Sequence, residues 1–105
     1  MKLSVMERIL LGDMMSTYQG SFTNLKLIRE GREAISFKED ELAKLNIEES
    51  DGKIKWNPQG ALEIGAVEID LNLTVFKVLK DMFVKLNDEQ KLTEQHFSLC
   101  EKFLI

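Results

Sequence analysis

The chain has 105 residues, of which 44% are hydrophobic and 30% charged, and its formal net charge is −4. One cysteine excludes an internal disulfide framework, and one histidine excludes a zinc site built mainly from His and Cys. Length and composition predict a single globular domain over residues 1–105. The longest early apolar run, residues 9–11, is shorter than the roughly 7–15 residues of a signal peptide or the roughly 20 of a membrane span. We therefore expect a cytosolic protein without a membrane partner.

Three helices are predicted in the first half of the chain. Residues 3–16 are apolar on most sides, which is typical of a central helix or of one shared with a partner. Thr23 is the expected N-cap of a second helix over 24–35. A capping box that starts at Ser36 predicts a short third helix over 38–45.

Strand-like patterns follow these helices. An Asp-Gly pair at residues 51–52 lies between two such runs and predicts a β-hairpin, in which a two-residue turn pairs Glu48 with Lys55. Alternation over 62–71 changes phase near Gly65, which predicts a third strand with a bulge at that glycine.

Two further helices are predicted, over 72–86 and over 94–104, the second capped by Thr93. The expected fold class is α+β, with about five helices packed on a small antiparallel sheet made of the hairpin and one strand.

His96 and Cys100 are the only local candidates for catalysis, because a helix places residues four apart on one face. Both lie within the apolar arc of their helix, and no third group or oxyanion-forming turn accompanies them. Motifs for phosphate binding or a nucleophile elbow are absent. We interpret the pair as structural and predict a non-enzymatic protein with no catalytic residue, metal or cofactor.

Three helices followed by a hairpin also resemble a winged-helix layout, in which the third helix enters the major groove of DNA. Here the first turn of that helix carries three carboxylates, and the hairpin tip carries three more. These charges would repel phosphates, so the sequence disfavours nucleic acid as a partner. A winged-helix regulator remains the alternative function.

The same carboxylates favour a protein partner with a basic surface, although a solvated acidic surface would have the same composition. Trp56 on the hairpin is a candidate anchor. Leu73 and Val84 fall outside the main apolar arc of helix 72–86 and are candidates for an apolar interface, either with another protein or in a homodimer. The predicted partner-binding residues are Glu39, Asp40, Glu41, Glu48, Glu49, Asp51, Trp56, Leu73 and Val84.

Several segments resemble small bacteriophage and prophage accessory proteins. They are residues 3–8 (LSVMER), 36–41 (SFKEDE), 55–57 (KWN) and 91–97 (KLTEQHF). The resemblance implies the cytoplasm of a bacterial host and an accessory phage role, and it assigns no catalytic or binding residue. Small phage proteins of this type often bind host proteins, immunity components included. The predicted function is thus a protein-interaction module that inhibits a host defence protein. A self-assembling structural phage protein is a further alternative.

Overall fold

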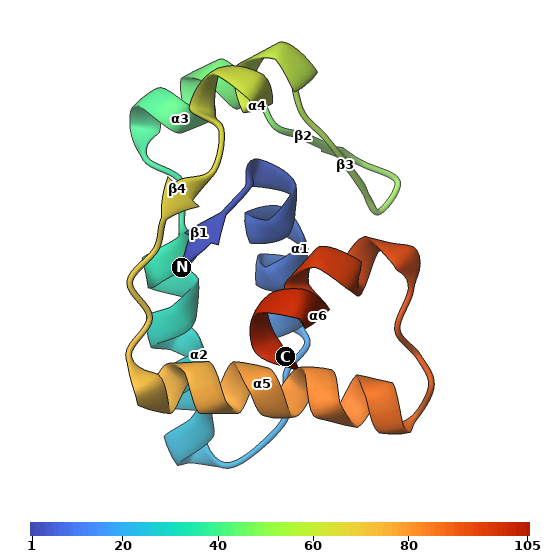
Figure 1. Cartoon of the computed structure of the whole chain (residues 1–105). Coiled ribbons are helices and arrows are strands. Elements are labelled where there is room, and N and C mark those ends of the chain that lie inside the picture. The colour runs from blue at the N-terminus through green and yellow to red at the C-terminus, as the bar shows by residue number, and fades with distance from the viewer.

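The computed structural model describes residues 1–105 and has an α+β fold with six α-helices and two separate two-stranded antiparallel sheets (Figure 1). In chain order the elements are β1 (Lys2–Leu3), α1 (Val5–Ser16), α2 (Phe22–Ile35), α3 (Glu39–Leu45), β2 (Glu48–Ser50), β3 (Lys53–Lys55), α4 (Pro58–Ile64), β4 (Val67–Glu68), α5 (Leu73–Asp88), a 3₁₀ turn η1 (Glu94–His96) and α6 (Phe97–Phe103).

Polar side chains at the N-caps fix where several helices begin. Ser4 accepts a hydrogen bond from the amide of Glu7, whose carboxylate accepts one from the amide of Ser4, and this capping box opens α1. Asn57 caps α4, and Pro58 at its first position has a backbone angle that suits the start of a helix. Asn72 caps α5 by accepting from an amide of its first turn.

The main hydrophobic core lies among α1, α2, α5 and α6, with β1 and β4 at its edge (Figure 1). At its centre Phe83 and Phe103 are almost fully buried, with ring centroids 5.1 Å apart, and Phe76 stacks on the other side of Phe103 at 5.0 Å. We call this part of the molecule the body.

Residues 39–64, which comprise α3, the β2–β3 hairpin and α4, form a smaller unit that we call the lobe. In Figure 1 it lies at the top, at the opposite end from α5. The lobe has its own packing, since α3 lies against α4 and β2 pairs with β3. Its only buried residues are Glu41, Leu45 and Gly60, and none of them belongs to the core of the body. A Cβ at Gly60 would collide with the backbone carbonyl of Lys44, so the glycine permits the close approach of α4 to α3.

The hairpin prediction is confirmed, including the pairing of Glu48 with Lys55. The third strand predicted over 62–71 is confirmed only at Val67–Glu68, which form β4, and its predicted extent, bulge and pairing are wrong. Residues up to Ile64 belong to α4, Gly65 ends that helix rather than forming a bulge, and β4 pairs with β1 instead of with the hairpin. There is accordingly no three-stranded sheet.

Two predicted helix starts also need correction. Ser21, not Thr23, caps α2 through the amide of Asn24, so that helix begins earlier than expected. Ser36 ends α2 instead of opening α3, because its hydroxyl donates to the carbonyl of Glu33. The last predicted helix is divided into η1 and α6.

Candidate protein-interaction surface

A buried ion pair joins the lobe to the body. Arg8 of α1 is only 3% exposed, and its guanidinium donates to both carboxylate oxygens of Glu41 at 2.7 and 3.1 Å. It also donates to the backbone carbonyls of Ile35 and Ser36, at 3.1 and 2.8 Å, and stacks over the ring of Phe37. One side chain thus connects α1, the end of α2 and the first turn of α3.

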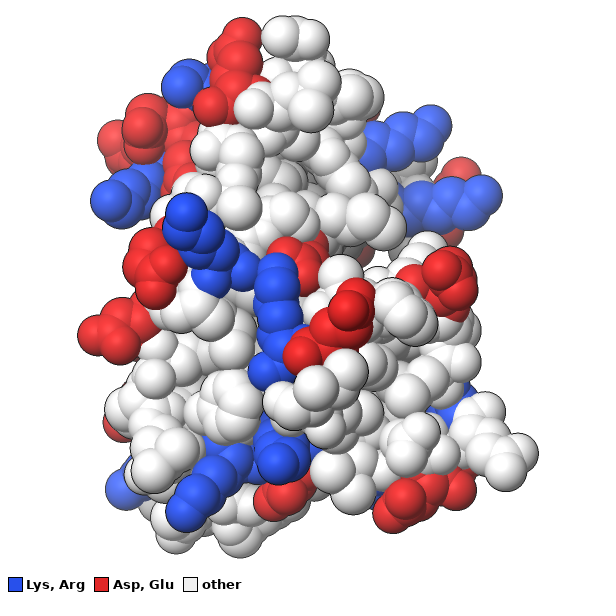
Figure 2. Space-filling view, in the orientation of Figure 1, with Lys and Arg blue, Asp and Glu red and all other residues white.

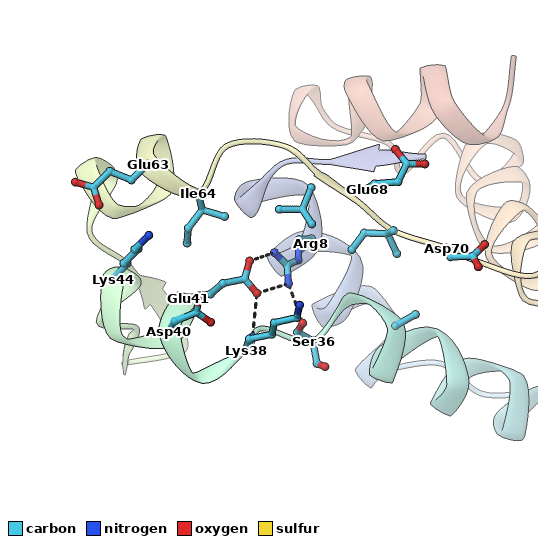
Figure 3. A pocket seen from close by; sticks show the side chains of 13 residues that line it. Arg8, Ser36, Lys38, Asp40, Glu41, Lys44, Glu63, Ile64, Glu68 and Asp70 are labelled. Atoms are coloured by element: carbon cyan, nitrogen blue, oxygen red, sulfur yellow. Dashed lines mark hydrogen bonds and ion pairs between the residues drawn. The ribbon is translucent and has the colours of Figure 1, made fainter.

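The carboxylate of Glu41 is ionised and fully hydrogen-bonded in this pair. Its carboxylate accepts from the amide of Lys38 as well, which caps α3 (Figure 3). Hydrogen bonding to Arg8 holds the pKa of Glu41 below its usual range, although burial opposes this shift. The carboxylate is therefore ionised and already satisfied, so it is not free for a partner as the sequence-based hypothesis required.

The ion pair forms part of the wall of an open cavity of about 400 Å³ between α3, α4 and β4 (Figure 3). Its lining includes the carboxylates of Asp40, Glu63, Glu68 and Asp70 and the amine of Lys44. In Figure 3 the side chain of Glu63 points away from Arg8, and those of Glu68 and Asp70 lie at the other end of the cavity. Nowhere do three potential metal ligands come together.

The remaining predicted acidic residues do not form one continuous surface. Glu39 and Asp40 are exposed in the first turn of α3, where carboxylates interact favourably with the positive end of the helix dipole. Glu48 lies opposite Lys55 on one face of the hairpin. Glu49, one residue further, points to the opposite face and lines a separate cavity of about 440 Å³ between the hairpin and the body.

Asp51 lies at the tip of the hairpin with φ of 53°, a left-handed conformation that a type I′ turn requires. Even so, the lobe as a whole is acidic, because it contains seven Asp and Glu residues against three Lys and so has a net charge of −4. The remaining 11 acidic and 11 basic residues cancel. The net charge of the chain therefore resides in the lobe.

Large apolar side chains are exposed beside these charges. Leu62 on α4 is 76% exposed, and Leu42 on α3 is 45% exposed. Ile47, which precedes β2, and Ile54 of β3 are also exposed. Figure 2 shows carboxylates over α3 at the upper left and uncharged surface next to them over α4. Neither leucine was predicted as a site residue. Only Leu42 could have been identified from the sequence, because it directly follows three carboxylates, Glu39, Asp40 and Glu41.

The apolar residues predicted to bind a partner lie at opposite ends of the molecule. Trp56 follows the hairpin and is half-buried, which leaves part of its ring accessible. Leu73 and Val84 are exposed, as expected, but they lie on α5 at the other end of the molecule (Figure 1). No single partner surface of ordinary size therefore includes all of the predicted residues.

The arrangement of α3 differs from that in a winged helix. In that fold the recognition helix packs on the two preceding helices. Here α3 packs mainly on α4, which follows the hairpin. The structure thus offers no support for inserting α3 into a major groove.

His96 and Cys100 have the surroundings of structural residues. Nδ1 of His96 accepts a hydrogen bond from the amide of Thr93. Burial raises the pKa of the Cys100 thiol, which keeps it protonated and makes it a poor nucleophile.

Comparison of the chain with family models, with curated proteins and with solved structures gave no match. None of its helices is both long enough and apolar enough to span a membrane.

Proposed function

We propose that the chain is a non-enzymatic protein-interaction module of phage origin whose lobe binds a basic surface on a host defence protein in the bacterial cytoplasm. The observation that supports this most is the composition of the lobe, which combines the whole net charge of the molecule with exposed Leu42 and Leu62. Acidic side chains steer a basic partner towards the lobe, and the apolar side chains provide area to bury after contact.

The way the lobe is held adds a second argument. A binding surface costs less entropy on association when it is already rigid. The Arg8–Glu41 pair and the contact of Gly60 with the backbone of Lys44 hold α3 and α4 in place. The lobe would then present a formed surface rather than fold on contact.

The resemblance to small phage proteins suggests the source of the partner. A host defence protein that acts on nucleic acid has a basic groove, and an acidic surface can occupy such a groove by charge complementarity. Inhibition would follow from blocking access to that groove.

The experiment is affinity capture from bacterial lysate with three tagged baits, followed by mass spectrometry and by an affinity measurement on the captured protein. The lobe variant is Leu62→Ser/Glu63→Lys, which removes one exposed leucine and reverses one charge. The matched control is Leu73→Ser/Asp81→Lys on α5, which makes the same chemical changes at the other end. All four residues are exposed, so both variants should fold.

We expect the wild type and the control to retain one stoichiometric host protein, and the lobe variant to bind it at least about tenfold more weakly. Equal loss in both variants, loss in the control alone, or capture of nucleic acid without protein would contradict the proposal. Recovery of the bait alone as concentration-dependent oligomers would indicate a self-assembling protein instead.

A further inference from the structure

A second surface of the opposite charge lies on the body, in a groove of about 330 Å³ between the end of α1 and residues 22–32 of α2. We call it the α1–α2 groove. Its apolar lining includes Met15, Phe22 and Leu25, its basic lining consists of Lys26, Arg29 and Arg32, and no carboxylate takes part. The two cavities described above both include carboxylates, whereas this groove combines several cations with no acidic residue.

The three cations form no ion pair within the chain. None of the four ion pairs in the structure includes Lys26, Arg29 or Arg32. The amine of Lys26 lies 4.6 Å from the ring centroid of Phe22, which is itself 73% exposed. An exposed aromatic ring with an unpaired cation above it offers a partner both apolar area and charge.

The spacing along α2 suits an elongated partner. Phe22, Lys26, Arg29 and Arg32 follow one another at intervals of three or four residues, so they form one stripe on the helix. The stripe extends over about 15 Å, which corresponds to about three turns of an apposed helix. The volume of the groove, about 330 Å³, lies at the lower end of the range for small-molecule pockets and is enough to receive one or two apolar side chains.

We propose that the α1–α2 groove binds an acidic amphipathic helix of another protein, with apolar side chains in the groove and carboxylates opposite the stripe of cations. This mode, in which a helix lies in a groove, needs an apolar floor and charges at helical spacing, and both are present. Nucleic acid is the less suitable occupant, because three cations give little phosphate affinity and the chain as a whole is acidic.

The test uses a fluorescent peptide of about 18 residues, long enough to become helical on binding, with Leu at positions i, i+3, i+4 and i+7 and Glu at the flanking positions. Three matched probes accompany it: one with Lys in place of Glu, one with Ser in place of Leu, and a single-stranded oligonucleotide of equal length. Fluorescence anisotropy at low salt measures binding to the full chain, and sedimentation velocity measures self-association.

We expect the acidic amphipathic peptide to bind more tightly than the three matched probes. Lys26→Glu/Arg29→Glu should weaken that binding at least about tenfold, because the variant places like charges opposite each other. Lys53→Glu/Lys80→Glu, which changes net charge equally at exposed positions outside the groove, should leave it unchanged.

Equal binding by the groove variant and the wild type would overturn the proposal. So would stronger binding of the oligonucleotide, or self-association that the groove variant abolishes, since either result assigns the groove to a different occupant. The lobe variant Leu62→Ser/Glu63→Lys should bind the peptide like the wild type. The two proposals can therefore fail separately.

Discussion

Removing the carboxylate of Glu41 should destabilise the protein strongly, because it leaves a buried cation without its counter-ion. Arg8 makes four hydrogen bonds, of which two go to Glu41 and two to backbone carbonyls. Hydrogen bonds to charged groups contribute about 1.5–3 kcal/mol each, and breaking a buried ion pair from one side costs about 3–5 kcal/mol. We expect Glu41→Met to lower the free energy of unfolding by about 3–5 kcal/mol, the cost of breaking a buried ion pair from one side.

Substitution of the other member of the pair, Arg8→Met, should lower the free energy of unfolding by less. The side chain of Arg8 is 2% exposed, whereas that of Glu41 is 12% exposed at the edge of the cavity. After Arg8→Met the remaining carboxylate still reaches water and the amide of Lys38. In the double variant neither charge is left unpaired, so its cost should be smaller than the sum of the two single costs.

Urea denaturation followed by circular dichroism measures all three variants. With a urea dependence of about 2 kcal/mol per molar, a loss of 4 kcal/mol lowers the midpoint by about 2 M. A loss below about 1 kcal/mol for Glu41→Met would refute the reasoning, because the pair would then behave like an exposed salt bridge. Additive costs in the double variant would also refute it.

Other predictions concern pH, backbone packing and thiol chemistry. Burial alone would raise the pKa of Glu7, but hydrogen bonds from Lys102 and from the amide of Ser4 outweigh it. The folded-state pKa of Glu7, like that of Glu41, is therefore lowered. The two carboxylates stabilise the fold fully above their unfolded-state pKa, and this contribution is lost as the pH falls through the folded-state pKa. Urea titrations from about pH 6 to pH 3 should show the free energy of unfolding decrease, and a flat profile would contradict the prediction. Thermal unfolding should show that Gly60→Ala destabilises the protein, because the added Cβ collides with the backbone of Lys44. Gly12→Ala within α1 meets only an ordinary van der Waals contact and should stabilise the protein by up to about 1 kcal/mol. Equal effects of the two substitutions would refute this account. Cys100 should react with iodoacetamide more slowly in the folded chain than in urea, because burial raises its pKa, and equal rates would contradict its structural role.

The sequence predicted those elements whose signals are local. The Asp-Gly turn and the alternating residues on both sides determined the hairpin register, and the apolar periodicity located α1, α2 and α5 within a few residues. The α+β class follows from these elements alone.

The wrong predictions occurred where two local signals compete. Alternation over 62–71 was taken as a strand, but Asn57 followed by Pro58 is a strong helix start, and it places Leu62 in α4. Ser36 could either end α2 or begin α3, and its hydroxyl donates a hydrogen bond to the carbonyl of Glu33 in α2. The pairing of β1 with β4 involves two residues on each side, too few for a periodic signal.

The candidate site was predictable only in its charge. Composition locates the acidic residues in the lobe, but Glu41 is removed from the accessible set by Arg8, which lies 33 residues away in the sequence. No local pattern indicates such a pairing. The groove was missed because its basic residues are spread through a helix whose overall composition is ordinary, and only the packing of α1 against α2 brings Met15 beside them to complete the groove.

Amide hydrogen exchange of the chain with and without its captured protein partner tests the central claim most directly, because it locates the contact without any substitution. The account predicts that protection on binding is concentrated in residues 39–64, in α3, the hairpin and α4. Protection confined to α5 and α6, with exchange in the lobe unchanged, would contradict it.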